Sequence, residues 1–92
     1  MKKITVITGG HGGMGKAIAR ELGKSTALVL ADRDKEKLAD VKAQLEETGY
    51  EVYTFVMDVT DEKNMMELAE YAASIGEVKN VIHTAGVSPT DT

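Results

Sequence analysis

Glycine occupies five of the seven positions from Gly9 to Gly15, directly after the apolar run Ile4–Ile7. A short apolar run that stops at glycine is typical of a buried strand. Glycine lets a ligand approach the backbone closely, and five glycines would cost too much chain entropy for a simple turn. A helix after this loop would point free N–H groups and its positive dipole end at an anion. The stretch therefore predicts a strand, a phosphate-binding loop and a helix in succession.

The rest of the chain repeats the alternation of short strands and longer helices. The expected strands cover residues 4–7, 27–31, 52–57 and 79–83. Each expected helix buries one apolar stripe. The first stripe is Met14, Ile18 and Leu22. The second is Leu38, Val41 and Leu45, in a helix capped by Asp34, and the third is Met65, Leu68, Ala72 and Ile75, in a helix that starts at Thr60 or Asp61. Gly23, Gly49 and Gly76 follow these helices.

Such alternation implies an α/β fold, a parallel sheet with right-handed crossovers and helices on both faces. We expect one domain over residues 1–92, a Rossmann-like doubly wound sheet of four strands in the order 3-2-1-4. Ligands of such sheets bind at the carboxyl ends of the strands, so we expect the site residues to follow the strands directly.

Composition limits the partners and the compartment. The net charge is −4 with no basic run, which argues against a nucleic-acid or anionic-membrane partner. The absence of cysteine excludes disulfides and thiolate metal sites. The apolar run Ile4–Ile7 is too short for a signal sequence or a membrane span. We expect a soluble, cytoplasmic domain.

The glycine-rich stretch satisfies three phosphate-binding spacings. They are G-x-G-x-x-G at Gly10, Gly12 and Gly15, most of the P-loop pattern at Gly10, Gly15 and Lys16, and T-G-x-x-x-G-x-G at Thr8, Gly9, Gly13 and Gly15. The P-loop interpretation is weakened by Ala17, because that position then has no hydroxyl to hold Mg²⁺. Asp58 at a strand end could still serve as the acid of a degenerate P-loop protein, so this alternative stays open.

A carboxylate, Asp32, ends the second expected strand seventeen residues after Gly15. There it can accept hydrogen bonds from the adenosine ribose hydroxyls, and it would repel a 2′-phosphate. NAD is therefore favoured over NADP. Arg33 works against this preference, because a guanidinium can stack on adenine or pair with that phosphate. Asp32 could instead be a helix-capping acid with no ligand.

Four short motifs stand in order at the ends of the expected strands. They are Thr8-Gly9-x-x-x-Gly13-x-Gly15, Asp32-Arg33, Asp58-Val59 and His83-Thr84-Ala85-Gly86. Each is weak alone, but together they make the chain resemble the N-terminal, NAD-binding half of a short-chain dehydrogenase/reductase. The similarity covers nearly the whole sequence. It implies an oxidoreductase that transfers hydride between nicotinamide and a carbonyl or alcohol substrate.

The resemblance also implies a role for each matching position. The pyrophosphate and adenosine would be wrapped, mainly through the backbone, by Gly9, His11, Gly13, Met14 and Gly15. Asp32 would select the ribose, and Arg33 would flank the adenine. The Asp58 carboxylate would meet the adenine amino group, with Val59 packed beside the ring. Close backbone approach on the nicotinamide side would come from Ala85 and Gly86.

The chain departs from the family at the fourth strand, where Asn-Asn-Ala-Gly is usual and His83-Thr84 stands instead. The family asparagines are thought to brace the sheet, so we expect binding to survive. We interpret His83 as a structural histidine, although an exposed imidazole would titrate near neutral pH.

The family's catalytic Tyr-x-x-x-Lys pair is missing from the sequence. Four residues after the three tyrosines stand Thr54, Met57 and Ile75, and Ser88 comes too early to match the catalytic serine. We therefore expect no catalytic residue and no metal site on this chain, and no activity from it alone. We interpret it as a fragment of a longer dehydrogenase, with a non-catalytic NAD-binding or sensor module as the alternative.

The expected strand order leaves the fourth strand at an edge of the sheet. Exposed edges pair readily with further strands. We therefore expect self-association through this strand, or marginal folding.

Overall fold

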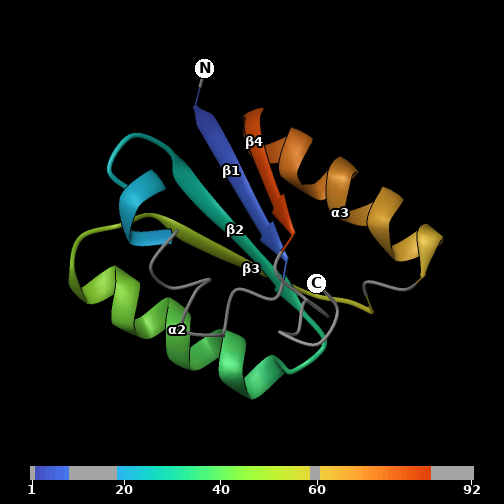
Figure 1. Ribbon diagram of the computed structural model, residues 1–92, viewed down its shortest axis with the longest axis horizontal. Coiled ribbons are helices and arrows are strands. Elements are labelled where there is room, and N and C mark those ends of the chain that lie inside the picture. Colours follow the sequence, from blue (N-terminus) through green and yellow to red (C-terminus); the bar gives the residue numbers. More distant parts are fainter. Residues whose placement is uncertain (1, 9–18, 59–60, 84–92) are drawn as a thin grey trace, which may run out of the picture.

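The computed structural model describes residues 2–8, 19–58 and 61–83 (Figure 1). The elements are β1 (Lys3–Thr8), β2 (Ala27–Asp32), α2 (Lys35–Glu47), β3 (Val52–Val56), α3 (Glu62–Ile75) and β4 (Glu77–His83). Residues 19–22 are also helical.

The four strands form one parallel sheet in the order β3-β2-β1-β4, which confirms the predicted fold class and strand order. In Figure 1, α2 and α3 lie on opposite sides of this sheet. All the strand pairs are parallel, and parallel strands need crossover connections. Each crossover in this chain includes helical residues. The arrangement is therefore doubly wound.

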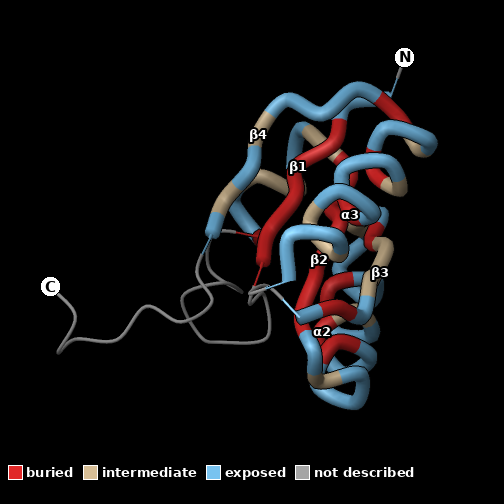
Figure 2. The backbone as a smooth tube through the Cα atoms, turned by 90° about the vertical axis from the view of Figure 1, so that its right-hand side faces the viewer, coloured by how far each residue is buried: buried red, intermediate tan, exposed pale blue. Residues whose placement is uncertain are grey.

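Alternate residues of the central strands pack into two separate hydrophobic cores, one on each face of the sheet. On the face covered by α3, strand residues such as Val6 and Val29 pack with Leu68 and Ala72. On the other face, Ile7, Leu28 and Leu30 pack with Leu38, Val41 and Leu45 of α2. Burial on both faces explains why the central strands read as continuous apolar runs rather than alternating ones. Five of the six residues of β1 are buried, whereas β4 is largely exposed at the edge of the sheet (Figure 2).

Both described helices begin at the acids expected from the sequence. The N–H of Lys37 donates to Asp34 Oδ1 at 3.1 Å, and the N–H of Lys63 donates to Asp61 Oδ1 at 2.9 Å. Side-chain oxygens at this position satisfy N–H groups that have no partner within the helix. After α2, Gly49 adopts a φ of +96°, a conformation in which glycine ends many helices.

Strand β4 begins two residues earlier than the sequence predicts, at Glu77 instead of Lys79. The reason is a contact with the start of the chain, because the N–H of Glu77 donates to the carbonyl of Lys2 at 2.7 Å. Gly76 makes this approach possible, since a Cβ there would lie 2.3 Å from the Lys2 carbonyl oxygen.

Candidate functional site

The carboxyl ends of all four strands meet at one edge of the sheet. Thr8 is in register with both Ala31 and His83, and Asp32 is in register with Val56. The chain order reverses between β1 and β4, since β2 lies on one side of β1 and β4 on the other. In open α/β sheets this reversal opens a crevice in which ligands bind. We call this end of the sheet, where the strands terminate, the carboxyl edge. It is distinct from the two edge strands, β3 and β4.

Asp32 lies at the carboxyl edge with only 7% of its surface exposed. Its Oδ1 accepts a hydrogen bond from the N–H of Asp34 at 3.1 Å, which holds the turn between β2 and α2. The capping acid of α2 is Asp34, so the alternative in which Asp32 caps this helix is wrong. A buried carboxylate at a strand end is suited to accept hydrogen bonds from hydroxyl groups. Arg33 beside it is exposed.

Asp58 lies next to this acid, after the end of β3. The N–H of the intervening Met57 donates to the carbonyl oxygen of Asp32 at 2.9 Å, and Met57 is 4% exposed. The side chain of Asp58 is exposed. The structure thus places Asp32 and Asp58 at the ends of two neighbouring strands, where the expected strand order puts them.

The backbone of Asp58 is held by a side chain that sequence reasoning missed. The N–H of Asp58 donates to Asn64 Oδ1 at 3.0 Å, and the carbonyl of Asp58 accepts from the N–H of Asp61 at 3.1 Å. The Nδ2 of Asn64 donates in turn to Glu67 Oε1 at 3.0 Å. A polar residue at the third helical position often reaches back to the preceding backbone, so the spacing from Asp61 to Asn64 was the available signal.

Thr8 and His83 join the ends of β1 and β4. The distance between Thr8 Oγ1 and His83 Nδ1 is 3.1 Å, a hydrogen bond whose direction depends on the tautomer of the ring. Thr8 is buried and His83 is exposed. This contact agrees with the interpretation of His83 as a structural histidine.

The other predicted cofactor residues lie outside the part of the chain that the structure describes. They are Gly9, His11, Gly13, Met14, Gly15, Val59, Ala85 and Gly86.

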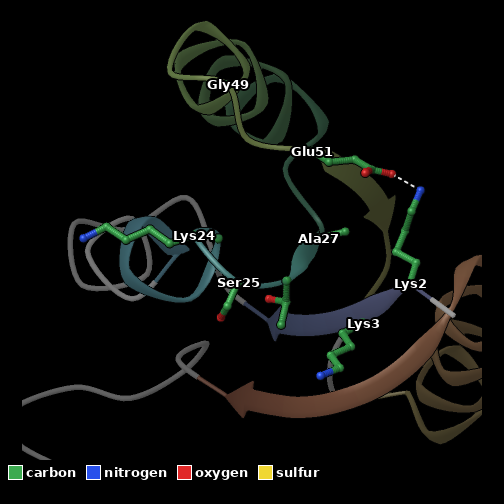
Figure 3. A pocket seen from close by; sticks show the side chains of 9 residues that line it. Lys2, Lys3, Lys24, Ser25, Ala27, Gly49 and Glu51 are labelled. Atoms are coloured by element: carbon green, nitrogen blue, oxygen red, sulfur yellow. Dashed lines mark hydrogen bonds and ion pairs between the residues drawn. The ribbon is translucent and has the colours of Figure 1, made fainter.

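A tyrosine and a lysine do meet in space, although they are not four residues apart in the sequence. Lys2 Nζ lies 3.2 Å from Tyr53 OH, and both groups contact the Glu51 carboxylate. We call these three residues the amino-edge cluster, because they lie at the amino ends of β1 and β3. Figure 3 shows Lys2 and Glu51 pointing toward one another at this edge. The cluster lies at the opposite ends of the strands from Asp32 and Asp58, so it is not placed to act on a ligand bound beside those two acids.

Hydrogen bonding and charge pairing shift the pKa values of two residues in the amino-edge cluster. The hydrogen bonds that Lys2 donates, first to Glu51 and then to Tyr53, raise the pKa of Lys2 above its ordinary value of 10.5. The hydrogen bonds from Lys2 and then Tyr53 lower the pKa of Glu51 below its ordinary value of 4.5. An open cleft of about 290 Å³ adjoins the cluster, lined by Lys3, Lys24 and Ser25 among others (Figure 3).

Neither a metal-binding cluster nor a membrane-spanning helix is present among the described residues. In residues 2–8, 19–58 and 61–83, no three His, Asp or Glu side chains gather closely enough to hold a metal ion. Among the helices of that same part of the chain, none is both long and apolar enough to cross a membrane.

The chain is similar to known dehydrogenases over most of its length. A family model described as short chain dehydrogenase matches residues 3–92. The chain is 34% identical over 89 residues to an (S)-acetoin-forming diacetyl reductase from Staphylococcus epidermidis, covering 95% of this chain and 35% of that protein. The chain spans about a third of the length of the curated relatives it matches first.

Solved structures with bound dinucleotide share the fold. A variant of actinorhodin polyketide ketoreductase, solved with NADPH, superposes with a TM-score of 0.87 at 27% identity, covering 94% of this chain and 34% of that one. A dehydrogenase/reductase from Burkholderia phymatum, solved with NAD, has a TM-score of 0.73 at 35% identity and covers 79% of this chain and 26% of that one. Neighbours of this fold therefore bind either dinucleotide.

Proposed function

The chain belongs to the short-chain dehydrogenase family, and from this premise we propose that it binds NAD at the carboxyl edge as the nucleotide-binding part of an oxidoreductase. The observation that carries the proposal is the pair Asp32 and Asp58, joined through Met57 at the ends of β2 and β3. A ribose offers hydroxyl donors and an adenine offers an amino donor, and two neighbouring carboxylates match both.

The assignment of roles follows the fold and the family pattern. Residues 9–15 would hold the pyrophosphate, Asp32 the adenosine ribose and Asp58 the adenine amino group. Arg33 and Val59 would flank the adenine, and Ala85 and Gly86 would approach the nicotinamide side. Thr8 and His83 would brace the strand reversal beneath the dinucleotide.

The preference for NAD rests on the charge of Asp32. A 2′-phosphate would lie near a carboxylate that is 7% exposed, where water screens the repulsion poorly. The solved relatives hold NADPH or NAD, so the Asp32 carboxylate alone supports the preference.

When bound, NAD supplies a nicotinamide ring that accepts or donates hydride. The residues of this chain would bind and orient the dinucleotide for that step. We propose that the acid–base residues acting on the carbonyl or alcohol substrate lie outside these 92 residues, because no Tyr-x-x-x-Lys pair occurs among them. The chain alone would then be inactive. We propose a cytoplasmic setting, supported by the absence of cysteine.

We also propose that the protein associates with itself through β4. The strand lies at an edge of the sheet, and Val81 on it is 53% exposed. An exposed apolar side chain on an edge strand favours contact with a second strand.

Calorimetric titration with NAD, NADP and Mg·ATP tests the proposal. We expect binding of NAD, weaker binding of NADP and none of Mg·ATP. Mg-dependent ATP binding without NAD binding would favour the degenerate P-loop alternative instead. NAD binding by a full-length protein that shows no Tyr-x-x-x-Lys pair would favour a non-catalytic sensor.

A further inference from the structure

Asn64 lies in the first turn of α3 and connects this helix to the residue two positions after β3. Its Oδ1 accepts from the backbone N–H of Asp58 at 3.0 Å, across six residues. Its Nδ2 donates to Glu67 Oε1 at 3.0 Å, one helical turn further on. The side chain is half-buried, so these bonds form at the margin of the carboxyl edge.

We propose that Asn64 is a positioning residue for adenine recognition, acting through Asp58. The inference rests on the proposed binding of NAD. The Asp58 side chain is exposed, and the position of its backbone helps to set its direction. The N–H of Asp58 is bonded to Asn64 and its carbonyl to Asp61, and the preceding residue, Met57, is bonded to Asp32. Of these bonds, only the bond from Asn64 is made by a side chain.

An amide suits this position for a chemical reason. The N–H of Asp58 is bonded to an acceptor and the Glu67 carboxylate to a donor, and an amide carries both in one side chain. Acidic residues flank Asn64 in the sequence, namely Asp58, Asp61, Glu62 and Glu67. A carboxylate at position 64 would add repulsion among these groups and lose the donor. Asn64 therefore binds both partners without adding a negative charge.

This role predicts an effect on base selectivity. The amino group of adenine donates a hydrogen bond to the Asp58 carboxylate, whereas hypoxanthine presents a carbonyl oxygen that the carboxylate repels. A well-oriented Asp58 therefore favours NAD over nicotinamide hypoxanthine dinucleotide. When the orientation is lost, NAD binds more weakly and the hypoxanthine analogue does not.

The test compares the dissociation constants of these two dinucleotides by calorimetry. For Asn64→Ala we expect NAD binding to weaken about fivefold, the usual effect of one lost hydrogen bond, with little change for the hypoxanthine analogue. Asn64→Asp keeps the acceptor for the Asp58 N–H and should retain more of the selectivity, which provides a milder variant if Asn64→Ala does not fold. Met66→Ala changes an exposed side chain of the same helix and serves as the matched control.

A double variant separates positioning from a general loss of stability. If Asn64 acts through Asp58, then adding Asn64→Ala to Asp58→Ala should weaken NAD no further. Additive losses, or equal weakening of both dinucleotides by Asn64→Ala, would overturn the inference. Wild-type protein that binds neither dinucleotide would overturn the proposed function itself. Wild-type protein that prefers NAD, with Asn64 variants that do the same, would overturn only the role of Asn64.

Discussion

The N–H of Met57 donates to the carbonyl oxygen of Asp32 at 2.9 Å, and this bond ties the ends of β2 and β3 together at the carboxyl edge. Asp32 and Met57 are both buried, so water does not compete for the bond. The two acids that we assign to the ribose and the adenine are thereby held at a fixed spacing. To measure how Asp32 acts on the ligand, a substitution at this position must therefore leave the backbone hydrogen bonds intact.

Asp32→Asn removes the negative charge and keeps an oxygen that can accept from the N–H of Asp34. We expect this variant to lose affinity for NAD and to gain affinity for NADP, because the repulsion of the 2′-phosphate is gone. The ratio of the two dissociation constants should shift about tenfold toward NADP, as expected for hydrogen bonds to a charged group. Calorimetric titration with both dinucleotides measures this ratio.

Asp40→Asn provides the matched control for that experiment, since it removes an exposed carboxylate of α2. It should leave the ratio unchanged. If Asp32→Asn weakened NAD and NADP equally, Asp32 would not select between them.

The contacts that could be predicted from the sequence are those within a few residues. Asp34 and Asp61 stand directly before apolar helical stripes, so their capping roles follow from local pattern. The strand order follows from alternation, since parallel strands need crossovers. The bond from Asp58 to Asn64 was missed because it depends on how the loop between them bends. Lys2 and Glu51 are 49 residues apart, and only the assembled sheet brings them together.

Asp34→Ala should destabilise the fold by about 1 kcal/mol, because it removes the side-chain acceptor for the N–H of Lys37 at the start of α2. Thermal unfolding followed by circular dichroism measures the change. Asp34→Ser keeps a capping oxygen and should recover most of the loss. An alanine variant as stable as the wild type would show that this cap contributes nothing.

Gly76→Ala should cost about 3 kcal/mol, at the upper end for overpacking, because the new Cβ would lie 2.3 Å from the Lys2 carbonyl oxygen. Relief of this clash would move the backbone and disturb the bond from Glu77 to Lys2. Gly49→Ala is the matched comparison. Its Cβ would meet open space, so only the positive φ opposes it, at about 1 kcal/mol. Equal losses in chemical denaturation would contradict the close approach at Gly76.

Val81→Lys should reduce self-association, because a charge on an edge strand opposes pairing with a second strand. Val81 is 53% exposed, so the folded monomer should tolerate the change. Sedimentation velocity over a range of concentrations measures the association. Val56→Lys is the control, since Val56 is 51% exposed on β3 at the opposite edge. If only Val56→Lys dissociated the assembly, the contact would lie on β3.

The amino-edge cluster should make stability depend on pH at both extremes. The pKa of Glu51 is lowered in the fold, so its contribution is present above the ordinary value of 4.5 and is lost as the pH falls through the lowered value. The pKa of Lys2 is raised, so its contribution is present below 10.5 and is lost as the pH rises through the raised value. The ion pair should therefore stabilise the fold on the plateau between these limits.

Glu51→Gln removes the negative partner and tests this directly. The melting temperature of the variant should lie below that of the wild type at neutral pH. The difference should shrink in acid, where Glu51 is protonated in both the folded and the unfolded protein. The effect should be small and should diminish in high salt, because both side chains are more than a third exposed. Glu47→Gln at the exposed end of α2 removes a carboxylate outside the cluster and serves as the matched control. A difference in melting temperature that stayed constant from neutral to acid pH would assign the effect of Glu51 to packing instead of charge.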